Sequence, residues 1–290
     1  MMCVKELDIL FKTFLYAVKM LWRIFSAALV SACAVTVVWW LLGKTTKLAD
    51  TLFFFFSVFG TAVLVFTSIC AIRLAVKGKK AARIYADTLV NGYTDKFFSY
   101  YENRVKRAKR KNSKNSAMLA LASCYSEASR YDDAMNVLDS MDFLSMSEPM
   151  RASYFNTLLY TAILSDDLNK AEKIYMSGKY LLEKYSRGSS GCEIAHTLAA
   201  LEFARGNVYT AEQMILEILD GPVTDMTASG CGVYLVMIYL QTERFEKAKL
   251  AAEMTFPVIA GYRDKQIMLR LMKIIENIYS VRGDTIIQES

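Results

Sequence analysis

The one histidine of the chain, His196, is the first candidate for acid–base chemistry, and Glu193 lies three residues before it. On a helix that spacing puts both side chains on one face, which is more typical of a surface pair than of a catalytic unit. The six cysteines are scattered and show neither metal-site spacing nor a disulfide framework. No phosphate-binding glycine loop or nucleophile motif occurs. The sequence therefore predicts no catalytic, cofactor-binding or metal-ligating residues, and a protein that is not an enzyme.

A cationic stretch is the second candidate for chemistry, because residues 104–114 carry seven positive charges and no negative one. These are Arg104, Lys106, Arg107, Lys109, Arg110, Lys111 and Lys114. Such a cluster is typical of a nucleic-acid patch, of a solvated helix end, or of a segment held on anionic lipid. No aromatic platform interleaves with it, which disfavours single-strand binding. We expect the stretch to face anionic membrane lipid, and we expect no nucleic-acid partner.

A spacing of alanines indicates the elements that position these residues. Ala134, Ala171, Ala211 and Ala248 recur at intervals of 37, 40 and 37 residues. A period in this range is typical of stacked helical hairpins, in which a small residue lets two helices approach closely. Each alanine is expected to open the second helix of a hairpin.

The segments around these alanines align without gaps and resemble tetratricopeptide repeats (TPRs). They are LALASCYSEASRYDDAMNVL, NTLLYTAILSDDLNKAEKIY, HTLAALEFARGNVYTAEQMI and VYLVMIYLQTERFEKAKLAA. The usual tryptophan of the first helix is absent, and the usual turn glycine survives only at Gly206. A degenerate fifth copy is expected to precede them, with Phe97 in the position of the alanine. The helix RDKQIMLRLMKIIENIYSV, which follows the last copy, is expected to cap the array.

The resemblance implies a peptide groove on the inner face of the first helices. The register of the alanines puts five candidate groove residues there: Asn156, Tyr160, His196, Phe203 and Met237. The basic clamp that some TPR proteins use for an acidic chaperone tail is missing, because only Asn156 is of that type. The surface suits an amphipathic helix or an apolar peptide. An alternative is that part of it packs against the C-terminal cap.

The first third of the chain differs in kind. Residues 24–42 and 51–72 contain no charge and reach the ~20 apolar residues that cross a bilayer. A short linker joins them, so they predict a two-helix transmembrane hairpin. Before it, Lys5, Lys12 and Lys19 recur every seven residues, which favours an interfacial amphipathic helix. Flanking Lys and Arg predict that both termini and the repeats are cytoplasmic, at a plasma or bacterial inner membrane.

The sequence as a whole predicts an all-α fold: a transmembrane hairpin, then a TPR-like α-solenoid with a C-terminal capping helix. The expected domains are residues 1–76 (interfacial helix and spans), 77–114 (degenerate repeat and basic segment), 115–282 (TPR-like domain with cap) and 283–290 (tail). We expect a membrane-anchored scaffold that recruits a protein or peptide partner at the cytoplasmic membrane face. The alternatives are a non-catalytic subunit of a membrane enzyme or transport complex, and a self-associating structural module.

Overall fold

The computed structural model describes residue 26 and residues 29–41, 48–187 and 191–288. These residues form α-helices and two short 3-10 helices, with no strand among them. The all-helical class predicted from the sequence is therefore confirmed for this part of the chain. The chain divides into two compact units, Met1–Arg83 (unit 1) and Ile84–Ser290 (unit 2). The boundary falls within the segment 77–114 that the sequence set apart.

Unit 1 contains helical residues 29–41 and most of helix α2, Leu48–Asn91. The rings of Trp39 and Phe54 stack with centroids 4.5 Å apart, which joins the two helices. The predicted interfacial helix around Lys5, Lys12 and Lys19 lies outside the described residues.

The prediction of transmembrane spans near 24–42 and 51–72 is wrong for the described structure. Among the residues described, none of the helices combines the length and the apolar composition that crossing a bilayer requires. The second predicted span does not end near residue 72, because α2 continues through Arg73, Lys77 and Arg83 to Asn91. The predicted two-span topology, with both termini and the repeats cytoplasmic, depended on these spans and is therefore also wrong for the described structure.

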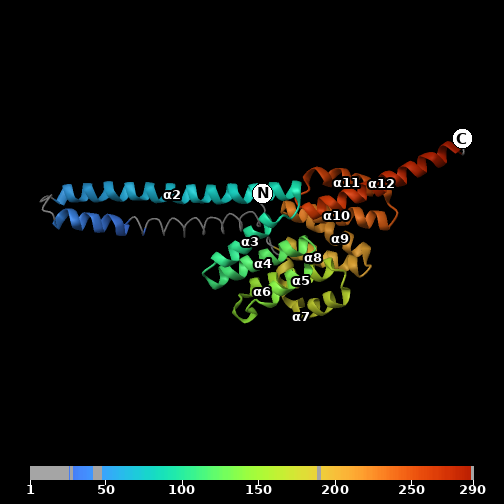
Figure 1. Cartoon of the computed structure of the whole chain (residues 1–290), viewed down its shortest axis with the longest axis horizontal. Coiled ribbons are helices and arrows are strands. Elements are labelled where there is room, and N and C mark those ends of the chain that lie inside the picture. Colours follow the sequence, from blue (N-terminus) through green and yellow to red (C-terminus); the bar gives the residue numbers. More distant parts are fainter. Residues whose placement is uncertain (1–25, 27–28, 42–47, 188–190, 289–290) are drawn as a thin grey trace. The chain divides into compact units, whose positions relative to one another are not determined.

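Unit 2 is built from four consecutive helical hairpins, shown in green through orange in Figure 1. In chain order the pairs are α4 (Lys111–Glu127) with α5 (Tyr131–Asp139), α6 (Glu148–Leu164) with α7 (Leu168–Ser186), α8 (Cys192–Ala204) with α9 (Val208–Leu219), and α10 (Asp225–Gln241) with α11 (Phe245–Thr255). Each first helix packs on the first helix of the next pair as well as on its own partner. Apolar side chains are therefore buried both within and between hairpins.

Local sequence signals start these helices. The Asp167 carboxylate accepts a hydrogen bond from the Lys170 N–H at 2.9 Å and caps α7. Thr224 caps α10 in the same way, through the Thr227 N–H at 3.2 Å. Pro149 lies in the first turn of α6, where its missing N–H removes no helical hydrogen bond. Each signal satisfies or removes a donor that the helix start would otherwise leave unpaired.

The four repeated alanines occupy one equivalent position. Ala134, Ala171, Ala211 and Ala248 are each the fourth residue of the second helix of a pair, and none has any exposed surface. A larger side chain would hold the two helices apart, so only a small residue permits this contact. The prediction that Ala134 and Ala211 are buried between paired helices is confirmed.

The turns within the hairpins also share one geometry. The residue two positions after each first helix has a positive φ: 59° at Ser129, 59° at Asp166, 83° at Gly206 and 57° at Glu243. The next residue then donates its backbone N–H to a carbonyl five positions earlier, as Arg130 does to Tyr125 at 2.8 Å and Arg244 does to Tyr239 at 2.8 Å. Glycine adopts this left-handed conformation without cost, whereas the other three residues adopt it under strain.

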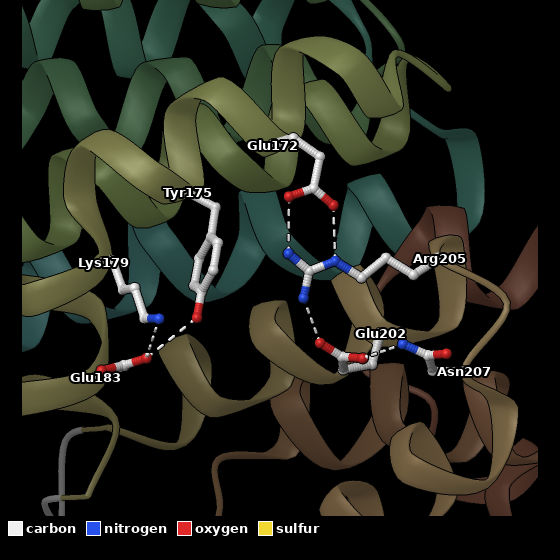
Figure 2. A network of polar contacts seen from close by, with 7 residues as sticks. All are labelled: Glu172, Tyr175, Lys179, Glu183, Glu202, Arg205 and Asn207. Atoms are coloured by element: carbon white, nitrogen blue, oxygen red, sulfur yellow. Dashed lines mark hydrogen bonds and ion pairs between the residues drawn. The ribbon is translucent and has the colours of Figure 1, made fainter.

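Charged contacts join consecutive hairpins on the side of the second helices (Figure 2). Arg205 donates to both carboxylate oxygens of Glu172 at 2.7 Å, and it also pairs with Glu202. Arg244 repeats the arrangement one hairpin later, with both oxygens of Glu212 at 2.8 and 2.6 Å. Hydrogen bonding from these arginines lowers the pKa of Glu172 and of Glu212. Both glutamates directly follow a buried alanine, so the ion pairs have the same register as the helix packing.

The segment before the first hairpin replaces the alanine contact with an aromatic cluster. Helix α3 (Asp95–Arg107) carries Phe97, which is 8% exposed, in the predicted alanine position. Its ring lies 5.0 Å from Tyr101 and 5.2 Å from Tyr93, and Phe98 stacks on Tyr125 of α4. The packing at Phe97 is thus organised around aromatic rings instead of a small residue.

At the other end, helix α12 (Tyr262–Gln288) follows the 3-10 turn Phe256–Val258 and packs on α10 and α11. Met268 and Ile275 are buried in the core that these helices share, whereas Arg270, Lys273 and Glu276 face outward. The terminal helix therefore covers one apolar end of the array and turns a polar face outward.

We predict that Ala211→Leu lowers the free energy of unfolding by roughly 1–3 kcal/mol, because the extra methylene groups overpack the contact between α8 and α9. Chemical denaturation of the full chain, followed by far-UV circular dichroism, measures the effect. The matched control is Ala204→Leu at an exposed position at the end of α8, which should change stability little. An unchanged midpoint for Ala211→Leu would show that the helix register is different.

We predict that Glu243→Gly raises the free energy of unfolding by about 1 kcal/mol, because glycine removes the strain of φ 57° at this turn. The control Glu246→Gly changes a nearby exposed glutamate inside the first turn of α11, where glycine should cost about 1 kcal/mol. The same denaturation series compares the two variants. Equal destabilisation by both would contradict the strained-turn assignment.

Candidate functional site

Three of the five predicted groove residues meet on the inner face of the first helices. The ring of Tyr160 on α6 lies 5.9 Å from that of His196 on α8, and His196 lies 5.5 Å from Tyr234 on α10. Tyr234 also contacts Phe203, at 5.5 Å. Tyr234 therefore links the predicted residues, although the register had placed Met237, and not Tyr234, on this face. We call these four side chains the aromatic row.

His196 is buried at the centre of this row, with 8% of its surface exposed. Its Nε2 is buried without a well-formed hydrogen bond, and it lies 2.7 Å from the point where a Cβ on Gly230 would stand. Burial lowers the pKa of His196 to about 4; the Gly230 backbone opposes this shift and Arg263 adds to it. The imidazole is therefore neutral at pH 7, and a glycine opposite it leaves the space that the ring fills.

The first turn of α12 supplies two charged residues to the same face. The Ser229 hydroxyl donates to the Asp264 carboxylate at 2.7 Å, and both residues are buried. Burial raises the pKa of Asp264, whereas Ser229 and Arg263 act to lower it. Arg263 also acts electrostatically on Tyr160, Tyr234 and Glu127.

Glu127, the last residue of α4, completes this charged group. Burial, followed by the like charge of Asp264, raises the pKa of Glu127 to about 7; Arg263 and the Tyr160 hydroxyl act to lower it. A single guanidinium thus faces two carboxyl groups on the inner face. We call Glu127, Arg263, Asp264 and Ser229 the inner polar cluster.

Contacts from the opposite end of unit 2 hold this turn of α12 in place. The Tyr85 hydroxyl donates to the Ala260 carbonyl, and the Lys265 ammonium donates to the Leu89 carbonyl at 3.4 Å. The ring of Tyr93 lies 5.7 Å from that of Tyr262. Gly92, at φ 79°, approaches Tyr262 so closely that a Cβ would lie 3.0 Å from its ring. The two ends of unit 2 therefore meet over the aromatic row and cover it.

The rest of the inner face remains open as a pocket with a cavity volume of about 480 Å³, lined by polar and apolar side chains alike. Asn156 lies in it, and the Oδ1 atom of this residue is buried without a hydrogen-bond partner. Four serines and one carboxylate share the lining: Ser116, Ser123, Ser147, Ser153 and Glu193. Ser153 and Glu193 are exposed. We call this cavity the serine pocket.

The structure thus divides the five predicted groove residues. Asn156 lines the open pocket, whereas Tyr160, His196 and Phe203 belong to the covered aromatic row. Met237 is half-buried and packs against the core of the last hairpin. Arg263, Asp264 and Ser229 had no sequence signal, because nothing in the repeat period links the start of α12 to the inner face.

All seven basic residues of the stretch 104–114 are exposed. They occupy the last turn of α3, the connection to α4 and the first turn of α4, and we call this surface the basic corner. Arg104 lies over the ring of Tyr101 at 5.7 Å, and Lys111 pairs with Asp142 at 2.6 Å.

Other chemistry finds little support in the described residues. Within them, no three His, Cys, Asp or Glu side chains lie close enough to hold a metal ion. Burial raises the pKa of Cys231 and that of Cys124 to about 12, so these thiols stay protonated near neutral pH. Comparisons with protein-family models, curated proteins and solved structures found no match to this chain.

We predict that Glu127→Gln changes the pH dependence of stability. Because the folded pKa of Glu127 is about 7, above its ordinary value of 4.5, folding takes up a proton between these values. The wild type therefore loses stability as pH rises from about 4.5 to 7, and the variant lacks this loss. The variant's free energy of unfolding, relative to wild type, should rise by roughly 2 kcal/mol over this range.

His196 acts with the opposite sign, because its lowered pKa makes the unfolded chain bind more protons between about pH 4 and 6.5. It is present in both proteins, so its contribution cancels in the difference. Denaturation midpoints measured at intervals from pH 4 to 8 give the result. The control is Glu193→Gln, which makes the same substitution at an exposed glutamate of the inner face. A pH-independent difference for Glu127→Gln would contradict a protonated inner polar cluster.

Proposed function

We propose that unit 2 is a TPR-like protein-binding module, and that it binds an extended peptide segment of a partner in the serine pocket. The observation that carries this proposal is the Asn156 amide oxygen, which is buried without a partner at the wall of an open cavity of about 480 Å³. A buried acceptor without a hydrogen bond costs free energy, and rotation of the Asn156 side chain toward the cavity would let a ligand donor recover it.

The chemistry of the lining supports a peptide as the ligand. Serine hydroxyls and an asparagine amide donate and accept hydrogen bonds, as the backbone of an extended peptide requires. The lining carries one carboxylate, Glu193, and no basic residue. It therefore favours a neutral or cationic segment over an acidic tail. Repeat arrays present such surfaces along their first helices, and three of these, α4, α6 and α8, line the pocket.

In this proposal the aromatic row has a supporting role. Tyr160, His196 and Phe203 hold adjacent first helices at a fixed spacing under the start of α12, and Asn156 meets the partner. The fixed spacing keeps the pocket wall ordered before the peptide arrives, which lowers the entropy cost of binding.

The test compares two tryptophan variants of the full chain against a displayed library of random peptides. Ser153→Trp fills the pocket, and we expect it to weaken binding of the peptides enriched on wild type by about tenfold or more. Ser177→Trp is the matched control, because Ser177 is also exposed and also bonds a carbonyl four residues earlier, but on α7. Titration of the enriched peptides measures both affinities.

Two outcomes would contradict the proposal. If Ser153→Trp and Ser177→Trp bind the enriched peptides equally well, the serine pocket is not the site. If the wild type enriches no peptide family at all, unit 2 does not recognise linear segments. Equal far-UV spectra for the three proteins would show that neither tryptophan disturbs the helices.

A further inference from the structure

The basic corner contains no acidic residue, and among its seven cations Lys111 pairs with Asp142, which lies outside the segment. Residues 104–114 contain seven Lys and Arg and no Asp or Glu, whereas residues 115–290 contain sixteen Lys and Arg against twenty-three Asp and Glu. Positive charge is therefore concentrated at one place on a unit that is otherwise acidic. All seven of its side chains are exposed, so an external anion would reach them without a conformational change.

Backbone electrostatics increase the positive potential there. Helix α4 begins within the corner, its N-cap residue Arg110 makes no side-chain capping hydrogen bond, and its first turn has no acidic residue. A helix N-terminus carries a partial positive charge, so Lys111 and Lys114 lie where the dipole disfavours them. An external anion would relieve this repulsion.

An exposed leucine lies directly beside the corner. Leu144 is 84% exposed, in the 3-10 turn Phe143–Ser145. Asp142 caps this turn through the Ser145 N–H at 3.3 Å and pairs with Lys111 at 2.6 Å, so one carboxylate ties the leucine to the corner.

The turn that carries Leu144 is held firmly. The guanidinium of Arg151 donates to the Leu144 carbonyl at 3.1 Å. The neighbouring Phe143 points inward, with its ring 5.4 Å from Tyr154 and 5.6 Å from Phe155. Leu144 is thus an ordered apolar side chain that projects beside a cationic surface.

We propose that the basic corner and Leu144 together form a docking surface for an anionic lipid bilayer. Lys and Arg near such a surface each contribute to binding through the negative potential of the leaflet. An apolar side chain adds binding free energy when it enters the boundary between headgroups and acyl chains. A surface that only faced water would have no use for an exposed leucine at this position. The proposal concerns peripheral contact by unit 2 and is independent of the serine pocket.

A bilayer explains this surface better than a nucleic acid does. A leucine has no ring on which a base could stack, and Tyr101, the aromatic residue under Arg104, packs against Phe97 and Tyr100. The acidic remainder of unit 2 would repel a polyanion that extended beyond the corner.

Co-sedimentation of the full chain with vesicles tests the proposal. We compare neutral phosphatidylcholine vesicles with vesicles that also contain phosphatidylserine. The double variant Lys109→Glu/Arg110→Glu should lose about tenfold or more of the wild-type preference for the anionic vesicles. Leu144→Ser should weaken binding to them severalfold, and added salt should reduce the wild-type preference by screening.

Matched controls make the same changes elsewhere on unit 2. Arg270→Glu/Lys273→Glu reverses two exposed charges on α12, and Leu250→Ser removes an exposed leucine on α11. Both should bind as wild type does. Unit 1 is identical in all these proteins, so any contribution it makes to vesicle binding is common to them.

Three results would overturn the proposal. One is an anionic preference that survives Lys109→Glu/Arg110→Glu unchanged, and another is an equal loss in the α12 control. The third comes from a parallel titration with single- and double-stranded DNA oligonucleotides. If the corner variant loses oligonucleotide binding while it keeps vesicle binding, the corner binds nucleic acid instead. Ser153→Trp should leave vesicle binding intact, which separates this surface from the peptide site.

Discussion

The close contact between paired helices at four buried alanines is the constraint on which unit 2 depends. Each alanine is fully buried at the fourth position of a second helix, so the distance between the helices of every pair is set by a methyl group. With that distance repeated, the turns take one geometry and the first helices stack in a fixed register. The ion pairs of Arg205 and Arg244 follow the same register, because their glutamates are the residues next to the alanines. The inner face is a consequence of this repetition.

The repeat period predicted the hairpins because it reports a local requirement, namely a small residue wherever two helices touch. The structure also accounts for one position that departs from the repeat pattern. Glu202 stands where the other copies have Tyr125, Ala162 or Tyr239, and the structure uses it to pair with Arg205 and to accept a hydrogen bond from Asn207 at 2.7 Å. The inner polar cluster was not predictable in this way. Asp264 meets Ser229, and Tyr85 meets Ala260, through contacts that no period encodes.

The transmembrane prediction failed for a related reason. Hydropathy treated residues 51–72 as an element with two ends, because charges flank them. The helix itself has no end there, and α2 continues through those charges into the turn at Gly92. In the candidate site, Asn156 lies at the open pocket, and which part of the inner face stays open depends on where α12 begins.

The closure of the array gives the inner face two different halves. Where the start of α12 covers the aromatic row, the carboxyl groups of Glu127 and Asp264 and the guanidinium of Arg263 share a space that burial makes unfavourable for charge. Burial acts in opposite directions on acids and bases, so it raises the pKa of Glu127 to about 7 and lowers the pKa of His196 to about 4. Both groups are thereby driven toward their neutral forms, and the covered half tolerates its polar residues.

In the open half, water solvates Glu193 and the serines, and Asn156 keeps one unused acceptor. A ligand that supplies one donor and tolerates one carboxylate fits the open half, whereas the covered half has the composition of a core. The repeat packing therefore produces the face, and the first turn of α12 decides how much of it is left for a partner.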